Sequence, residues 1–340
     1  MKASVIIPAF NAQKTIQKCL ESLQQQNLPR KDYEILVVDD GSTDQTARIV
    51  SQFEGVLLLR QKNKGPAVAR NQGANHARGD LLVFLDADCV PKKNWLEKML
   101  EPFEDSQVAG VQGRYENSLD SWVARFIQFE IEERYERLKK GMATHKKIDF
   151  VSTYSAAYCK TVFLEQGGFD EGYRTASGED TDLSFSLAEK GYRLVFAPAA
   201  VVQHFHPTSL VKYFKTKFYR AYWRVRLYKQ HPEKVKKDSY TNPWIKIQMA
   251  AITFSLASLV IYIIGKFFGW GVFSFYWLFF FVYWLIITVL VQLFLSIPTA
   301  FFIFKKDWKL GIAAPFIFSA NAFLFIIGYF FGLLKLGGQK

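Results

Sequence analysis

The chain has 340 residues, 50% of them hydrophobic, and a formal net charge of +12. This length accommodates one sizeable domain and a further region. Three scattered cysteines exclude a disulfide framework and a spaced cysteine metal site, and they fit a reducing compartment. We interpret Cys89 as a buried, inert thiol. The opening run SVIIPAF (4–10) is too short for a secretory signal, so we expect the N-terminal domain on the cytoplasmic side.

Strand and helix patterns alternate over about the first 205 residues. Short apolar runs predict strands at residues 4–10, 34–40, 56–60 and 81–85. The segments between them have the apolar spacing of helices, with Asn11 and then Ser42 or Thr43 as expected N-caps and Pro66 in a first turn. Less regular strands are expected later, at 108–116, 150–159 and 192–198, with an amphipathic helix at 118–140. Repeated strand–helix units predict an α/β fold with a mostly parallel, doubly wound sheet.

Two aspartates follow the fourth strand, in the run LLVFLDADC (81–89). In parallel sheets, ligands bind in the crevice beyond the carboxyl ends of the strands, so we expect Asp86 and Asp88 to reach that crevice together. Two carboxylates there favour a hard divalent cation, which often shares its ligands with phosphates. The position of the pair therefore predicts a metal–diphosphate site, although an isolated Asp-x-Asp string is more often a solvated turn.

Further polar residues end the second strand and begin the third helix. Asp39 is expected to be the better ligand contact there, while Asp40 and Gly41 form a turn. Lys64 and Arg70 either neutralise a diphosphate or belong to a solvated helix face, and the pattern alone leaves both interpretations open.

Two later groups carry charge at the start of a helix and on a strand. Glu179 and Asp180 begin an expected helix and, by pattern alone, are N-terminal residues that interact favourably with the helix dipole. The dipole would lower the pKa of Asp180, and burial would oppose that shift. His204 and His206 have the spacing of residues on one face of a strand.

The last third of the chain is apolar and is preceded by a basic segment. Between residues 208 and 240, ten Lys or Arg stand against two acidic residues and are interleaved with aromatic side chains. This mixture fits nucleic acid or an anionic membrane surface, and its place directly before the apolar third favours the membrane. We therefore expect anionic lipids as partners and no nucleic acid.

Three apolar stretches, at about 247–267, 271–297 and 311–334, are each long enough to span a membrane. The second is expected to tilt or to break near Pro298. The positive-inside rule places the 208–246 segment and the Lys305, Lys306 and Lys309 loop in the cytoplasm, with the C-terminus outside. A buried helical bundle is a poor alternative for stretches this apolar.

Six motifs occur in order over about residues 1–207, and together they resemble the inverting glycosyltransferases of family 2, which have the nucleotide-sugar-binding GT-A fold. The motifs are VIIPAFN (5–11), VVDDGSTD (37–44), NKGPAVARN (63–71), FLDADC (84–89), GGFDE (167–171) and GEDTDLSF (178–185). The resemblance implies a Rossmann-like GT-A domain, followed here by an α-helical transmembrane region.

The resemblance also implies roles for individual residues. Pro8 and Asp39 would frame the nucleotide base with Arg70 nearby, Asp86 would lie toward the ribose and the metal, and Asp88 would bind Mn²⁺ or Mg²⁺ directly. Asp180, next to Glu179, would be the general base. Related enzymes often take a third metal ligand from a histidine in this region, for which His204 is the first candidate and His206 the second.

One departure from related enzymes bears on function. The Gln-x-x-Arg-Trp motif of processive polysaccharide synthases is missing, since residues 220–226 read RAYWRVR. Together with only three spans, this argues against a synthase that extrudes a polymer.

We therefore expect a membrane-bound, metal-dependent glycosyltransferase that moves one sugar from a nucleotide-diphosphate sugar, a UDP-sugar first of all, to a hydroxyl of a lipid-linked glycan or glycolipid. Residues 1–207 would form the catalytic domain, 208–246 the interfacial segment and 247–340 the multi-pass region in the plasma membrane. A polyprenyl-phosphate glycosyl synthase is the alternative enzyme, since a phosphate nucleophile needs no base. A silent nucleotide-binding scaffold is the non-enzymatic alternative.

Overall fold

The computed structural model describes residues 1–340 except 146, 176, 236–242 and 337–340. The chain divides into two compact units, which we describe separately. The first comprises Met1–Thr208 with Leu227–Tyr240, and the second comprises Ser209–Arg226 with Thr241–Lys340. Helix α8 (Leu210–Gln230) contributes residues to both.

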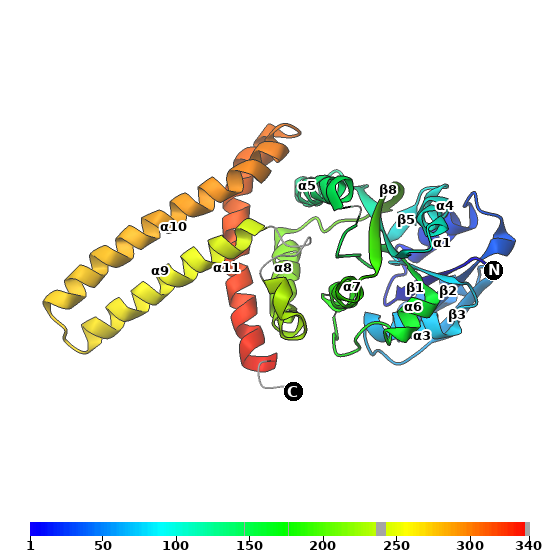
Figure 1. The fold of residues 1–340 in the computed structure, drawn as a ribbon, viewed down its shortest axis with the longest axis horizontal. Helices are drawn as coiled ribbons and strands as arrows, with labels where there is room; N and C mark the ends of the chain where they lie inside the picture. The colour runs from blue at the N-terminus through cyan, green and yellow to red at the C-terminus, as the bar shows by residue number, and fades with distance from the viewer. Residues whose placement is uncertain (146, 176, 236–242, 337–340) are drawn as a thin grey trace. The chain divides into compact units, whose positions relative to one another are not determined.

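The first unit is built on one eight-stranded sheet (Figure 1). The strand order is β3-β2-β1-β4-β7-β6-β8-β5. The strands are β1 (Ala3–Ala9), β2 (Tyr33–Asp39), β3 (Val56–Arg60), β4 (Leu81–Leu85), β5 (Cys89–Pro91), β6 (Val108–Asn117), β7 (Ser155–Cys159) and β8 (Arg193–His204).

The relative directions of neighbouring strands change across the sheet. The four strands β3, β2, β1 and β4 are parallel, as the alternation of strands and helices predicts. Strand β7 then pairs antiparallel with both β4 and β6, and β5 pairs antiparallel with β8, while β6 and β8 are parallel. The sheet is therefore mixed, with a parallel half (β3-β2-β1-β4) and a second half that contains both parallel and antiparallel pairs.

Helices cover both faces of this sheet (Figure 1). They are α1 (Ile16–Gln24), α2 (Thr46–Val50), α3 (Pro66–His76), α4 (Trp95–Leu100), α5 (Trp122–His145), α6 (Lys160–Glu165) and α7 (Glu179–Glu189). Short 3₁₀ helices lie at Arg30–Asp32, Glu101–Glu104 and Pro232–Val235.

Successive residues of β1 pack on opposite faces, as the period of a strand requires. Val5 and Ile7 belong to the core cluster that includes α1 and α4. Ile6 faces α3, where a Cβ on Gly73 would lie 2.4 Å from the Ile6 Cγ2 atom. The glycine therefore allows α3 to pack closely on the sheet.

The helix caps expected from the sequence are wrong. The Asn11 Oδ1 atom accepts a hydrogen bond from the Thr43 backbone N–H (2.9 Å), and the Asn11 N–H donates to the Ser42 hydroxyl (2.9 Å). Asp44 instead accepts from the Thr46 N–H at the start of α2. The loops after β1 and β2 thus bind each other, because the two neighbouring parallel strands bring them side by side.

The second unit contains α9 (Pro243–Phe267), α10 (Val272–Phe304), α11 (Trp308–Leu336) and most of α8. Three helices are long and apolar enough to cross a membrane, as the sequence predicts: Trp244–Phe267, Phe275–Phe304 and Trp308–Leu336. The break expected near Pro298 is wrong, because α10 continues through it to Phe304. At 33 residues, α10 is about 50 Å long, which exceeds a hydrocarbon core of about 30 Å and favours tilt.

Buried polar side chains join α9 to α10. The Gln248 and Gln292 amides each donate to the other's backbone carbonyl, at 3.3 and 3.0 Å, and the Ser255 and Thr288 hydroxyls lie 2.7 Å apart. Such interhelical hydrogen bonds hold helices together where apolar burial gives no driving force.

Candidate active site

A cavity of about 920 Å³ opens at the carboxyl ends of β1, β2 and β4. This is where ligands bind in open α/β sheets. Five segments contribute to it: the loop after β1, the loop after β2, the start of α3, the turn after β4 and the segment between α6 and α7. The lining residues that matter below are Pro8, Lys14, Asp40, Arg70, Asp86, Asp88 and Arg174.

Arg70 is the centre of a buried ionic network. Its side chain is 2% exposed, and it donates from Nη2 to Asp86 Oδ1 and from Nη1 to Glu179 Oε1, both at 2.8 Å. Glu179 is itself 1% exposed and also accepts from the Ser177 and Gly178 N–H groups. Arg70 therefore connects the cavity to the first turn of α7.

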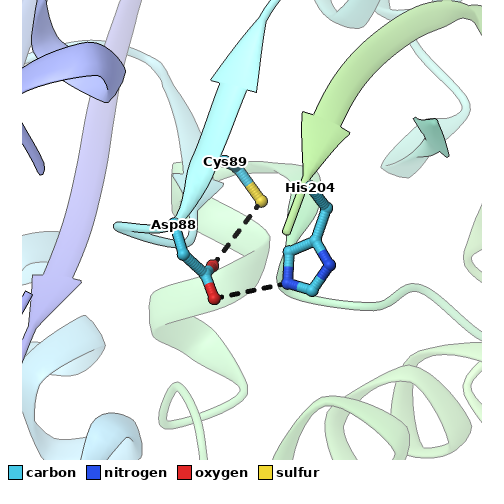
Figure 2. Close-up of side chains that lie close together, drawn as sticks. All are labelled: Asp88, Cys89 and His204. Atoms are coloured by element: carbon cyan, nitrogen blue, oxygen red, sulfur yellow. Dashed lines mark hydrogen bonds and ion pairs between the residues drawn. The ribbon is translucent and has the colours of Figure 1, made fainter. Parts of the chain in front are cut away.

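Asp88 lies apart from this network and faces His204 (Figure 2). The Asp88 Oδ2 atom is 3.3 Å from His204 Nε2. Burial raises the pKa of the Asp88 carboxyl, but the hydrogen bond and the electrostatic attraction of His204, with smaller backbone and His206 contributions, together outweigh burial, so the pKa is lowered. A carboxylate oxygen and an imidazole nitrogen at this spacing fit two ligands of one divalent cation.

Hydrogen bonds behind His204 fix the orientation of its ring. The His204 and His206 Nδ1 atoms are 2.9 Å apart, and His206 Nε2 is 3.0 Å from the Gln128 Oε1 atom. The Gln128 amide nitrogen donates to Glu132, so its oxygen accepts from His206 Nε2–H. His206 Nδ1 then accepts from His204 Nδ1–H, which turns the His204 Nε2 atom toward Asp88. Support of this kind sets the tautomer of a ligating histidine.

Asp180 lies beside Glu179 at the start of α7. Its Oδ1 atom accepts from the Thr181 N–H at 2.7 Å, and Oδ2 accepts from the Thr153 N–H at 3.4 Å. Burial raises the pKa of the Asp180 carboxyl, and the charge of Arg70 opposes that shift only in part. A carboxyl with a raised pKa is a stronger base once it is ionised.

The residues around β2 differ in their access to the cavity. Asp39 is fully buried, and its carboxylate accepts from the Ser42 N–H and from Arg60 Nε at 3.0 and 3.1 Å. Asp40 lines the cavity and accepts from the Lys64 and Gly65 N–H groups at 2.8 and 2.9 Å.

The structure thus brings Pro8, Arg70, Asp86 and Asp88 to one cavity. Asp39 and Lys64 do not line it, although both lie in the part of the chain that the structure describes. His204 lies on Asp88, and Glu179 and Asp180 are joined to the cavity through Arg70.

The sequence analysis did not identify Lys14, Arg174 or Gln128, and it interpreted Cys89 as an inert thiol. Lys14 and Arg174 line the cavity, and neither has a charged partner among the described residues. Gln128 supports the histidine pair, and the Cys89 sulfur lies 3.9 Å from Asp88 Oδ1. Of these four residues, only Cys89 could have been linked to the site from the sequence, because it directly follows the aspartate pair.

Comparisons with known proteins bear on the family and the fold. Residues 4–166 match the sequence model described as glycosyl transferase family 2. A pre-mycofactocin glycosyltransferase of Mycobacterium tuberculosis is 30% identical over 267 residues, which cover 76% of this chain and 55% of that protein. The chain therefore spans about half the length of that relative.

A Methanococcus voltae protein is 27% identical over 62% of this chain and 69% of its own length. Its name describes a transferase of a diacetamido-dideoxy-glucuronosyl group and includes a dolichyl N-acetylglucosaminyl phosphate. Among solved structures, a Pyrobaculum calidifontis mannosyltransferase in complex with GDP-mannose and Mn²⁺ superposes with a TM-score of 0.61 at 19% identity, over 97% of this chain and 87% of that one. At that identity the likeness shows the fold alone.

The resemblance read from the sequence is confirmed by the family match and by the fold. Residues 4–166 are therefore a glycosyltransferase family 2 domain, and the domain that contains them has the GT-A fold.

Proposed function

We propose that this chain is a membrane-bound, metal-dependent, inverting glycosyltransferase that moves one sugar from a nucleotide-diphosphate sugar to a hydroxyl of a membrane-associated acceptor. The observation that carries the proposal is the Arg70 network. It joins Asp86, at the edge of the cavity, to Glu179 and so to Asp180 on α7. A donor site and a proton acceptor are thereby held at fixed positions within one domain.

The donor diphosphate needs positive charge around it. Asp88 and His204 would hold a divalent cation, which acts as a Lewis acid on the leaving diphosphate. The imidazole nitrogen favours Mn²⁺ over Mg²⁺, because Mg²⁺ strongly prefers oxygen ligands. Arg70 is already paired with two carboxylates, so we assign the remaining diphosphate contacts to Lys14 and Arg174 instead of Lys64.

Recognition of the nucleotide base remains assigned to Pro8 and Asp39. Pro8 lines the cavity, whereas Arg60 binds the Asp39 carboxylate. The Arg60 side chain is 63% exposed, so it can move aside at little cost and release Asp39 to a donor. We expect a UDP-sugar, and because the solved mannosyltransferase holds GDP-mannose, a donor screen includes both nucleotides.

Asp180 is the base in this account. As the acceptor oxygen attacks the anomeric carbon, its proton passes to the Asp180 carboxylate, and the bond from that carbon to the diphosphate oxygen breaks. One displacement on the face opposite the leaving group inverts the anomeric configuration. Glu179 cannot serve as the base while Arg70 and two backbone N–H groups hold its oxygens, so it is a positioning residue.

Membrane attachment follows from the three long apolar helices and the basic α8 segment. In this proposal residues 1–207 are catalytic, 208–246 contact anionic lipids at the cytoplasmic face, and 247–340 are the multi-pass region in the plasma membrane. A lipid-linked acceptor is supported by the Methanococcus voltae relative, whose name includes a dolichyl-linked sugar phosphate.

A donor screen on the full-length protein in lipid nanodiscs tests the proposal. Radiolabelled UDP-, GDP- and dTDP-sugars are supplied with a membrane lipid extract and Mn²⁺, and label is counted in the lipid and glycan fractions. We expect transfer from one nucleotide class and loss of both transfer and donor binding in Asp88→Ala.

Absence of transfer from every donor, with nucleotide binding unaffected by Asp88→Ala, would support a silent scaffold. Label found only on a polyprenyl phosphate, released by mild acid, would support the alternative synthase.

A further inference from the structure

The Cys89 thiol lies within the group of side chains that faces the proposed metal position. Its sulfur is 3.9 Å from Asp88 Oδ1, while Asp88 Oδ2 is 3.3 Å from His204 Nε2 (Figure 2). One ligand atom from each of the three residues lies within 4.8 Å of the other two. Asp86, the other member of the aspartate pair, is bound by Arg70 instead.

The sheet register explains why these three side chains meet. Cys89 begins β5 and pairs directly with His204 at the end of β8, in an antiparallel pair. Directly opposite residues of such a pair project from the same face with their Cβ atoms about 4.5–5.5 Å apart. Asp88 immediately precedes the paired residue. The sheet therefore places Cys89 opposite His204, and the turn that leads into β5 places Asp88 beside them.

The spacing and the chemistry match a small divalent cation. Ligand atoms about 2.0–2.3 Å from Zn²⁺ at tetrahedral angles lie about 3.3–3.8 Å from one another. Here the Cys89 sulfur is 3.9 Å from Asp88 Oδ1 and His204 Nε2 is 3.3 Å from Asp88 Oδ2, so a small rotation of the carboxylate brings one of its oxygens into such a set. Because His204 is hydrogen-bonded to His206 through Nδ1, it can bind an ion through Nε2, the atom that faces Asp88. A sulfur, a nitrogen and an oxygen form a ligand set of the kind that selects Zn²⁺.

We propose that Cys89, Asp88 and His204 form a mixed thiolate–carboxylate–imidazole site that binds a thiophilic divalent cation such as Zn²⁺ or Cd²⁺. When the ion binds, the Cys89 S–H proton passes to water or buffer and a metal–sulfur bond takes its place. The ion fills the position proposed above for Mn²⁺, so it competes with Mn²⁺. That competition, and the inhibition of transfer that follows from it, rest on the proposed function, whereas the binding site does not.

Cadmium titration of the full-length protein tests the proposal, because a Cd²⁺–thiolate bond gives an ultraviolet charge-transfer band. We expect the band in the wild type, its loss in Cys89→Ser, and its presence in Cys19→Ser and Cys159→Ser. Cys19 is the matched control because it is as buried as Cys89. Zn²⁺ affinity in Cys89→Ser should fall by at least about 10–100-fold, the effect of losing even a supporting partner of a metal ligand.

Mn²⁺ binding, followed by electron paramagnetic resonance, separates a lost ligand from a misfolded protein. We expect Cys89→Ser to bind Mn²⁺ and Zn²⁺ to displace Mn²⁺ from the wild type. A band that persists in Cys89→Ser, or unchanged Zn²⁺ affinity in that variant, overturns the proposal. Failure of sugar transfer from every donor, with the cadmium band intact, overturns the proposed function and leaves the metal site standing.

Discussion

Methionine is similar in length to arginine but carries no charge. Replacing Arg70 with methionine therefore removes a buried cation and leaves the Asp86 and Glu179 carboxylates without their partner. The Glu179 side chain is 1% exposed, so water cannot hydrate its carboxylate once Arg70 is lost, whereas Asp86 is 31% exposed and can be hydrated. The cost therefore falls mainly on Glu179. Burial and the nearby Asp180 already raise the pKa of Glu179, with Arg70 opposing them, so loss of Arg70 drives Glu179 toward its protonated form.

Breaking a buried ion pair by removing one partner costs about 3–5 kcal/mol. For a domain of this size, that corresponds to a fall in the melting temperature of about 6–20 °C. The assay is thermal unfolding of the detergent-solubilised chain, followed by near-ultraviolet circular dichroism of the catalytic domain. Arg78→Met is the control, because Arg78 is exposed and its ion pair with Glu34 spans 4.0 Å; such a pair is worth about 0–1 kcal/mol.

The double variant Arg70→Met/Glu179→Gln sharpens the test. Neutralising Glu179 removes the uncompensated charge, so the double variant should regain part of the stability that Arg70→Met loses. A fall of less than about 2 °C in Arg70→Met, equal to that of Arg78→Met, would refute the reasoning. An additive fall in the double variant would equally contradict it, since contacting residues in one network are expected to couple.

Three further predictions concern pH, metal binding and packing. Sugar transfer should slow as the pH falls through the raised pKa of Asp180, because a protonated carboxyl cannot take the proton from the hydroxyl group of the sugar acceptor. A transfer rate that rises toward acid pH contradicts this. Gln128→Leu removes the acceptor for His206 and should weaken Mn²⁺ binding, measured by paramagnetic resonance, about 10–100-fold; an unchanged affinity refutes the role of that hydrogen bond. Gly73→Ala places a Cβ 2.4 Å from Ile6 Cγ2 and should cost about 1–3 kcal/mol in thermal unfolding, whereas a neutral result means that α3 moves freely on the sheet.

The position of the cavity was predictable, because the lengths of the strands and their alternation with helices determine which strand ends lie side by side. The run LLVFL became β4, and the turn after it carries Asp86 and Asp88 into the cavity. Apolar length alone likewise identified the three long C-terminal helices.

Partnerships across the sequence were not predictable from local patterns. The Arg70–Glu179 pair joins residues 109 positions apart, and the contact of Cys89 with the histidine region depends on β5 pairing with β8. The expected caps failed for a related reason, since Asn11 and Thr43 bind each other across neighbouring loops. In each case the partner comes from a segment that only the tertiary fold brings near.

Asp180→Asn shows whether the Asp180 carboxylate is the base for sugar transfer. The substitution keeps the size of the side chain and removes the carboxylate, so the full-length protein in nanodiscs should bind the donor found in the screen as the wild type does. Transfer of labelled sugar to the lipid fraction, measured under saturating Mn²⁺, should fall by about 10²–10⁴-fold, the usual contribution of a general base. Transfer at the wild-type rate by Asp180→Asn would contradict the claim that this chain is an inverting glycosyltransferase with Asp180 as its base.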